Sequence, residues 1–391
     1  MQILFVSDVS INNIIGGAER VLFEQSTRLA RAGHNVTILT RRNSAHQAPF
    51  ETINNVQEYR YAITDSHPIA FLDSTIRNGQ RIYREISSKK RFDVINFHQP
   101  FSALAVNLLR ETAGIKKVYT CHSLSFEEYA SRHPKTKSFL QMMARKTMEQ
   151  FSLERSSKIV VLSEFTKQKL AKTYGILPDK MVTIPGGADT DYFRPAHDRE
   201  ALKKNLNLPQ KAWILFTVRN LVPRMGLENL IKAMALIKNR NQKIILYIGG
   251  QGELKETLLS LIKELGLETS VQLLGFLSKE QLLDYYQTAD FFILPTAELE
   301  GFGLVTVESM ACGTPVLGTP VGGTLEILNT FDSSFLFQGV SAEQIADGIL
   351  QKHSQFSVRN ETYNLLRQRV RSFASDHYSW ERNIAKLSQL L

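Results

Sequence analysis

The sequence is poor in cysteine and has no long apolar run, and each scarcity excludes a class of protein. Cys121 and Cys312 are the only cysteines among 391 residues, and neither has a partner at a metal-site spacing. We therefore expect free thiols in a reducing compartment. No window approaches the roughly 18–20 apolar residues that span a bilayer, so any membrane contact is expected to be peripheral. The opening MQILFVSDVS lacks a basic n-region and predicts a first strand, not a signal peptide.

The sequence also lacks a complete dinucleotide fingerprint. GGQGE at 249–253 follows a predicted strand and opens a helix, but it is not G-x-G-x-x-G, and no acidic ribose-binding residue follows at the usual distance. This disfavours a nicotinamide-dependent oxidoreductase. No Cys/His finger, recognition-helix pattern or aromatic-basic array is present either, which disfavours a nucleic-acid-binding protein.

Length and charge indicate two domains of different character. Apolar residues make up 43% and charged residues 22% of the chain, as in soluble globular proteins, and 391 residues are too many for one core. Positions 1–190 hold 26 basic and 17 acidic residues, whereas the remainder holds 21 of each. The whole positive excess therefore lies in the first half, which favours an anionic membrane surface or an acidic partner there.

Strand and helix patterns alternate along almost the whole chain. The runs ILFVS at 3–7 and NVTILT at 35–40 predict strands, and the helical pattern between them stops at Gly33. Such alternation predicts parallel strands with crossover helices, so the expected class is α/β with two Rossmann-like, doubly wound parallel-sheet domains facing each other across a cleft. Further strands are expected at 92–98, 116–122, 158–163, 212–218, 243–250, 271–276 and 290–296.

The segment IPGGADTDYFRP, at 184–195, is rich in Gly, Pro and Asp and predicts a hinge. The expected domains are an N-terminal domain at 1–184, a linker at 185–198, a C-terminal domain at 199–371 and a closing helix at 372–391. The DTD stretch at 189–191 resembles an Asp-x-Asp metal site. Because it falls in the hinge, we interpret it as turn chemistry and expect no metal ion.

Ligands in open α/β sheets bind beyond the carboxyl ends of the strands, so polar and glycine residues there are candidates. Gly16 and Gly17 precede a helix, and their N–H groups could approach a phosphate, although a simple turn explains them equally well. His122 and, with less support, His98 each follow a strand. Either could contact a substrate near neutral pH or be a structural histidine.

The stretch ELEGFGLVTVESMACGTPVLGTPVGG, at 298–323, is the most unusual pattern in the sequence. Gly301, Phe302 and Gly303 predict a tight turn from strand to helix with backbone N–H groups left open. Glu300 lies on that turn and Glu308 lies on the helix. Burying Glu308 without a partner would cost several kcal/mol, so we expect the two carboxylates to bind vicinal hydroxyls of a sugar and a ribose. A glutamate that interacts with the helix dipole and an ordinary loop glutamate are the alternative.

Arg219 and Arg224 follow the strand at 212–218 and flank a proline turn. Two permanently charged guanidinium groups at the mouth of a sheet suit a diphosphate, because each can form forked hydrogen bonds. Two solvated surface arginines are the alternative.

Over nearly its whole length the sequence resembles the retaining GT-B glycosyltransferases of glycosyltransferase family 4. The resemblance is carried by GGAER, HSLSFEEY, VLSEFTKQKL, IPGGADTDYFRP, VRNLVPRMGLENLI and, most specifically, the 298–323 block. HYSWERNIAKLSQLL, at 377–391, is similar to the family's C-terminal helix, which crosses back to the N-terminal domain.

The resemblance implies a role for each candidate residue. Glu308 would bind the ribose hydroxyls, and Glu300 would lie near the donor sugar with the backbone of Phe302, Gly303 and Leu304. Gly16 and Gly17 would face the diphosphate from the other domain, and His122 would contact the donor sugar. One departure concerns the basic pair, since Asn220 and Met225 stand where the family has Arg and Lys. We expect Arg224 to reach the diphosphate and Arg219 to assist, with Asn220 also at the donor.

The expected function is transfer of a sugar from a nucleotide-diphosphate sugar to an acceptor hydroxyl, with retention and without a metal or other cofactor. Surface polysaccharide, glycolipid or lipid-linked saccharide synthesis in the cytoplasm is the expected setting. The basic helix SRHPKTKSFLQMMARKTMEQF, at 131–151, could lie on the inner face of an anionic membrane or be a plain surface helix. A catalytically silent nucleotide-sugar-binding protein is the alternative, and a nucleotide-sugar epimerase is another.

Overall fold

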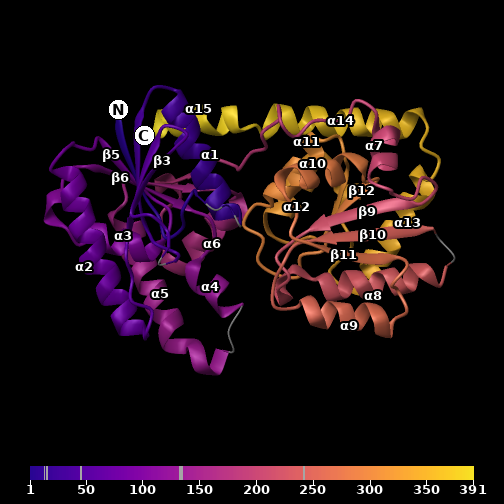
Figure 1. The fold of residues 1–391 in the computed structure, drawn as a ribbon, viewed down its shortest axis with the longest axis horizontal. Helices are drawn as coiled ribbons and strands as arrows, with labels where there is room; N and C mark the ends of the chain where they lie inside the picture. The colour runs from indigo at the N-terminus through magenta and orange to yellow at the C-terminus, as the bar shows by residue number, and fades with distance from the viewer. Residues whose placement is uncertain (13, 15, 45, 132–134, 241–242) are drawn as a thin grey trace. The chain divides into compact units, whose positions relative to one another are not determined.

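A computed structural model describes residues 1–391 except 13, 15, 45, 132–134 and 241–242. The chain divides into two compact units (Figure 1). The first comprises Met1–Pro185 together with Trp380–Leu391, and the second comprises Gly186–Ser379.

Within the described residues, eight strands of the first unit form one sheet in the order β3-β4-β2-β1-β5-β6-β7-β8. All neighbours pair in parallel except β3 and β4, which are antiparallel. The strands are β1 (Gln2–Val6), β2 (Asn35–Arg41), β3 (Phe50–Ile53), β4 (Val56–Tyr61), β5 (Val94–Phe97), β6 (Lys116–Cys121), β7 (Lys158–Val161) and β8 (Met181–Thr183).

Both faces of this sheet are covered, which explains why β1 is buried from Ile3 to Val6 on both of its faces. In β1, Leu4 and Val6 join one buried cluster, whereas Ile3 and Phe5 join the cluster on the opposite face. The helices are α1 (Gly17–Arg31), α2 (Pro68–Ser87), α3 (Pro100–Asn107), α4 (Ser125–Ala130), α5 (Lys135–Arg155), α6 (Glu164–Tyr174) and α15 (Trp380–Leu390), with short 3₁₀ turns at Arg110–Thr112 and Pro178–Lys180.

The second unit has a five-stranded, fully parallel sheet, again counting described residues, in the order β11-β10-β9-β12-β13. Its strands are β9 (Trp213–Val218), β10 (Ile244–Gly249), β11 (Val271–Gly275), β12 (Phe291–Leu294) and β13 (Val316–Gly318). Its helices are α7 (Arg199–Asn205), α8 (Leu227–Lys238), α9 (Lys255–Glu264), α10 (Lys279–Thr288), α11 (Leu304–Ala311), α12 (Gly322–Phe331), α13 (Ala342–Phe356) and α14 (Glu361–His377), with 3₁₀ turns at Pro223–Met225 and Ser333–Phe335.

The C-terminal helix belongs to the first unit. Leu387 of α15 is fully buried in the cluster that holds Ile3 and Phe5. Arg28 of α1 forms an ion pair with Glu381 of α15, which lies beside α1 in Figure 1. The sequence placed the return of the chain at residue 372, but α14 continues to His377 within the second unit, and the return begins at Trp380.

Within the described residues, no helix combines the length and the hydrophobicity needed to cross a membrane. The parallel sheets agree with the architecture expected from the sequence.

Candidate active site

The loop between β12 and α11 carries the first candidate residues. β12 ends at Leu294, and α11 begins at Leu304 after Gly303, whose φ of 89° is in the left-handed region that glycine readily adopts. The loop lies on the start of α12, where the N–H of Gly323 donates to the carbonyl oxygen of Glu300 at 3.0 Å. A Cβ on Gly322 would lie 2.0 Å from that same oxygen, so only glycine allows this approach.

Arg219 and Glu300 form a buried ion pair at the carboxyl ends of neighbouring strands. Arg219 directly follows β9, and its Nη2 donates to Oε2 of Glu300 at 2.5 Å. Thr296, two residues beyond β12, contacts both partners, at 3.2 Å from Arg219 and 3.1 Å from Glu300 Oε2. Arg219 is 8% exposed and Glu300 is 9% exposed. The sequence did not identify Thr296, although a polar residue just past an apolar strand was a usable signal.

Arg224 supports the loop that carries Glu300. Its Nη1 donates to the carbonyl oxygen of Leu299 at 2.7 Å, and its own carbonyl oxygen accepts from the N–H groups of Ala297 and Glu298. The two arginines thus have different contacts. Arg219 contacts the Glu300 side chain, whereas Arg224 contacts the backbone before it.

The two positions that depart from the family pattern lie beside these arginines. Asn220 is half-buried, and its carbonyl oxygen accepts from the N–H of Val222. Met225 is buried, and its sulfur is contacted by the Arg219 guanidinium. Arg219 therefore contacts Met225, the residue at the position where the family pattern has a lysine.

Glu308 is buried on α11 and is 6% exposed. The hydroxyl of Tyr286, on α10, donates to its Oε2 at 3.2 Å. Burial, followed by the charge of Glu308, raises the pKa of Tyr286 well above its usual value, so this phenol stays protonated and remains a donor.

Phe302 and Gly303 are both buried at the turn, and the Phe302 ring packs 5.7 Å from that of Tyr378, centroid to centroid. In the part of the chain that the structure describes, their backbone N–H groups donate no hydrogen bond. Leu304 opens α11, where the first N–H groups lack helical partners. The side chain of Phe302 thus serves packing, and the backbone of 302–304 remains available for a ligand.

In the first unit, Gly16 and Gly17 occupy the start of α1. Gly16 is the N-cap residue, and its N–H donates to Oε2 of Glu19 at 3.1 Å, so the N–H expected to face a phosphate already has an anionic partner. A Cβ on Gly16 would lie 3.0 Å from that carboxylate oxygen. α1 begins at Gly17.

His122 and His98 are brought together because they follow adjacent strands, β6 and β5. Nε2 of His122 lies 3.0 Å from Nδ1 of His98. Burial lowers the pKa of His122 to about 4, against a smaller opposing effect of Glu128. Burial, and then His122, holds the pKa of His98 well below its usual value. Both rings are therefore neutral at pH 7, and each can donate one hydrogen bond and accept another.

Asp189 accepts the backbone N–H of Tyr192 at 3.3 Å. This is the Asx-type turn contact expected of the DTD stretch in the hinge.

Comparison with known proteins decides what kind of protein has this geometry. The family described as Glycosyltransferase Family 4 matches residues 15–192, and the one described as Glycosyl transferases group 1 matches residues 198–363. A D-inositol 3-phosphate glycosyltransferase of Corynebacterium aurimucosum is 29% identical over 86% of this chain and 82% of its own. The chain is a family 4-type glycosyltransferase.

Solved structures agree on the GT-B fold. A sucrose-phosphate synthase from Thermosynechococcus elongatus superposes with a TM-score of 0.82 at 20% identity, over 100% of this chain and 98% of that one. HepE of Anabaena, solved in complex with UDP-glucose, has a TM-score of 0.76 at 16% identity, with coverage of 100% and 99%.

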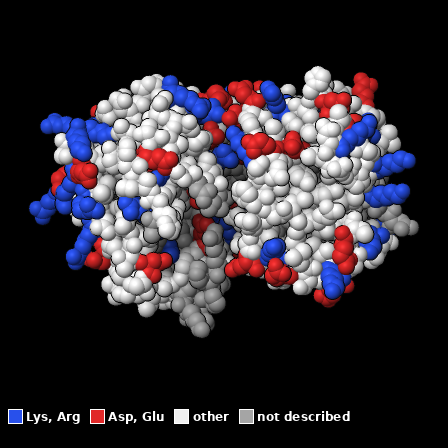
Figure 2. All heavy atoms as spheres, viewed as in Figure 1, with Lys and Arg blue, Asp and Glu red and all other residues white. Residues whose placement is uncertain are grey.

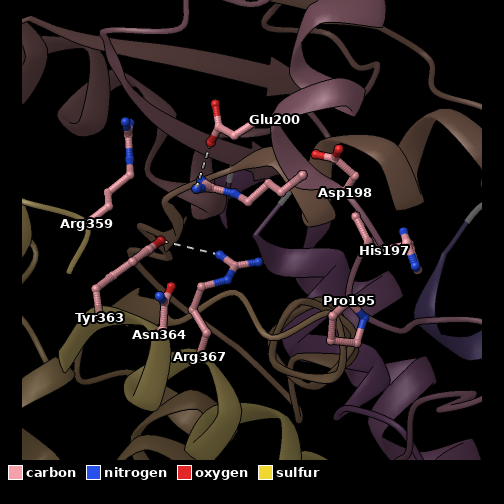
Figure 3. Close-up of a pocket in the computed structure, with 10 residues that line it drawn as sticks. Pro195, His197, Asp198, Glu200, Arg359, Tyr363, Asn364 and Arg367 are labelled. Carbon is pink, nitrogen blue, oxygen red and sulfur yellow. Dashed lines mark hydrogen bonds and ion pairs between the residues drawn. The ribbon is translucent and has the colours of Figure 1, made fainter. Parts of the chain in front are cut away.

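The glycosyltransferase also has an open cavity of about 470 Å³ in its second unit, lined mainly by 195–200 and 359–367 (Figure 3). It lies beside the amino end of β12, away from the ion pair at the carboxyl ends. Its arginines already have partners, since Arg199 and Arg359 bind Asp290, and Arg367 binds the carbonyl oxygens of Gln287 and Ala289. The cavity wall is therefore structural support for the sheet.

The neutral histidine pair predicts acid sensitivity of the glycosyltransferase. His122 has a folded pKa of about 4 against about 6.5 unfolded, so protons favour the unfolded chain. Its contribution to stability is present above about pH 6.5 and is lost as the pH falls towards 4. We expect ¹⁵N spectra to show a neutral His122 ring down to about pH 5, with the exposed His46 as reference. A charged His122 ring at pH 6 would contradict the assignment.

Proposed function

We propose that this glycosyltransferase moves a sugar from a nucleotide-diphosphate sugar to an acceptor hydroxyl, with retention of the anomeric configuration and without a metal ion. The observation that carries the proposal is the buried contact of Arg219, Glu300 and Thr296 beside the start of α11. The likeness to HepE, solved with UDP-glucose, supports a nucleotide-sugar donor.

The donor occupies the second unit in this proposal. Glu308 binds the ribose hydroxyls, and its buried carboxylate is oriented by the Tyr286 hydroxyl. Glu300, together with the backbone of Phe302, Gly303 and Leu304, lies at the donor sugar. Backbone N–H groups that the fold holds in position need no reorganisation during the reaction, which is the main advantage of a preorganised site.

Departure of the nucleotide diphosphate is the step in which negative charge develops. A guanidinium group stabilises that charge as it forms, and in a buried site it does so more strongly than in water. The sequence favours Arg224 for the larger part, but we propose Arg219 for it, because its guanidinium lies beside Glu300. We assign Arg224 mainly to holding the loop at Leu299, with a smaller direct part at the diphosphate. These permanent charges take the role that a metal ion has in other transferases.

Retention then follows from attack of the acceptor hydroxyl on the face from which the diphosphate leaves. His122 is neutral in this reaction and contacts the donor sugar, so it orients the sugar and adds no positive charge. Gly16, Gly17 and the first turn of α1 face the diphosphate, provided that Glu19 gives up the Gly16 N–H. Exclusion of water by the bound donor limits hydrolysis.

The donor assignment is tested by thermal unfolding with UDP-, GDP-, ADP- and dTDP-sugars. A ligand at 100 times its Kd adds about 2.7 kcal/mol, which raises Tm by several degrees. We expect one nucleotide family to give this increase, and Glu308→Gln and Arg224→Ala to reduce it. Glu298→Gln, an exposed glutamate on the same loop, is the matched control and should keep the full increase. No increase with any nucleotide sugar would contradict the proposal.

The division of roles is tested by transfer kinetics. We expect Arg219→Gln to lower kcat by roughly 10²–10³, the usual cost of one such donor. Arg240→Gln, which breaks an exposed ion pair with Asp347, is the control and should leave kcat unchanged. A larger loss in Arg224→Gln would reverse the assignment. In the same assay the product's anomeric proton signal should match the donor's configuration, and EDTA should leave the rate unaltered.

A catalytically silent nucleotide-sugar-binding protein is the second candidate function. It is favoured by the replacement of the family's basic pair by Asn220 and Met225. Donor-dependent stabilisation without transfer or hydrolysis would support it. The active enzyme is nevertheless favoured, because Arg219, next to Asn220 in the sequence, places a cation beside Glu300.

We further propose that the enzyme works in the cytoplasm, in surface polysaccharide, glycolipid or lipid-linked saccharide synthesis, and rests on an anionic membrane through its first unit. Basic side chains gather at the left edge of this unit in Figure 2, and α5 itself carries Arg145, Lys146 and Arg155. On α5, Phe139 is 63%, Leu140 82% and Met143 44% exposed. Residues 132–134 of the basic segment lie outside the described residues. Exposed apolar side chains near basic ones are typical of interfacial helices.

Vesicle sedimentation tests this contact. We expect binding to phosphatidylglycerol vesicles to fall at least tenfold in Phe139→Ser/Leu140→Ser, because two exposed apolar side chains no longer enter the lipid. Leu365→Ser, on α14 of the second unit, removes a leucine that is 57% exposed and should have no effect. Equal binding of the unmodified protein and both variants would contradict the proposal. Binding of the unmodified protein to neutral phosphatidylcholine vesicles as strongly as to phosphatidylglycerol vesicles would also contradict it.

A further inference from the structure

An arginine of the first unit lies between two aromatic rings and has no polar partner among the described residues. The guanidinium carbon of Arg145, on α5, is 4.7 Å from the centroid of Phe101 and 4.2 Å from that of Tyr129. Its Nε is buried without a hydrogen-bond partner, and no described carboxylate forms an ion pair with it. Stacking leaves the edge of a guanidinium open, and that edge carries the forked N–H donors.

A second arginine belongs to the same array. Arg41, at the end of β2, lies over the ring of Phe71 at 5.5 Å, and Phe71 packs edge-on against Phe101 at 5.2 Å. Like Arg145, Arg41 has no ion pair among the described residues. Burial, and to a smaller degree Arg41, lowers the pKa of Arg145. Two like charges therefore share one region, and an anion there would relieve their repulsion.

The two carboxylates that act electrostatically on Arg145 already accept hydrogen bonds from other groups. Asp8 accepts the N–H and the hydroxyl of Ser102 at 2.7 and 2.6 Å, and thereby caps α3. Glu128 accepts the hydroxyl of Ser123 at 3.0 Å. Both carboxylates favour the charged form of Arg145 from a distance, but neither is within ion-pair range. The forked donors of Arg145 are thus left for a ligand.

The array lies at the ligand-binding edge of the first sheet. Arg41 ends β2, Phe101 lies in the first turn of α3, which follows β5, and Tyr129 is on α4, which follows β6. In open α/β sheets this carboxyl edge is where ligands bind. His122 follows β6 at the same edge.

We infer that Arg145, with Arg41 beside it, binds a phosphate group on the sugar acceptor. This inference rests on the proposed function, and it narrows the acceptor from any hydroxyl compound to a phosphate-bearing one. A guanidinium fork matches two phosphate oxygens, and a second cation suits the dianion. The aromatic rings hold Arg145 in place before the ligand arrives, which reduces the entropy lost on binding.

Binding of inorganic phosphate to the full chain, measured by calorimetry at constant ionic strength, tests the site. We expect Arg145→Gln to weaken binding at least tenfold and Arg145→Lys to weaken it less, because lysine keeps the charge and the ring contact but lacks the fork. Arg155→Gln is the matched control, since Arg155 lies on the same helix over the ring of Phe151 at 3.5 Å. Phosphate binding that is unchanged in Arg145→Gln, or lost equally in Arg155→Gln, would overturn the inference.

Competition then identifies the source of the phosphate. Glycerol 3-phosphate and vesicles of phosphatidic acid in phosphatidylcholine each compete with inorganic phosphate. Displacement by the first alone supports a soluble acceptor, and displacement by the vesicles supports a lipid-borne one. Displacement by neither would overturn the inference, because a site closed to phosphate esters cannot hold an acceptor.

The same samples separate this inference from the proposed function. Nucleotide-sugar stabilisation depends on residues of the second unit, such as Glu308. Stabilisation by donor without Arg145-dependent phosphate binding would overturn the acceptor inference alone. Phosphate binding without stabilisation by any donor would overturn the proposed function and, with it, the assignment of this phosphate to an acceptor.

Discussion

The ion pair between Arg219 and Glu300 joins the end of β9 to the loop after β12, and the geometry of the candidate site depends on it. A buried ion pair contributes little net stability, because removing two charges from water offsets most of their attraction. Its value lies in specificity, since breaking it would leave one buried charge uncompensated. The pair therefore selects one arrangement of the loop, and Thr296 restricts that arrangement further.

Glycine makes this arrangement sterically possible. A Cβ on Gly250 would lie 1.8 Å from the carbonyl oxygen of Arg219, and one on Gly226 would lie 2.0 Å from that of Pro295. Both glycines also have positive φ values, 127° and 70°. The backbone behind the ion pair is thus packed so closely that side chains are excluded at these two glycine positions. The charged pair and the close backbone packing are two parts of one local constraint.

The fold could be predicted from the sequence because its signals are periodic and local. Apolar runs such as 35–40 and 290–296 identified strands, and Gly33 marked a helix end, without knowledge of the rest of the chain. The contacts of the site could not be predicted in the same way. Arg219 and Glu300 are 81 residues apart, and only the neighbouring positions of β9 and β12 in the sheet bring them together.

Two further expectations concern single residues, Gly16 and His98, whose hydrogen-bond partners are seen only in the structure. Gly16 was predicted to offer its N–H to a phosphate, but Glu19, three residues on, reaches back to take that N–H. A glutamate three residues after the N-cap is itself a sequence pattern that indicates such a cap. His98 received little weight from the sequence because its partner, His122, follows the adjacent strand and not the adjacent residue. Residues on adjacent parallel strands are separated in the sequence by a whole crossover connection. Their spacing in the sequence therefore does not reveal that they are neighbours in the fold.

The membership of α15 in the first unit has a consequence for how the chain folds during synthesis. Leu387 and Ile384 complete a cluster whose other members include Ile3 and Phe5 of the first strand. The ribosome adds Ile384 and Leu387 only after it has made the entire second unit. The first unit therefore emerges first but must wait, with one side of its sheet incompletely covered, until the last turns of the chain are released. In this protein the second unit is the part that can finish folding without help from sequence made later.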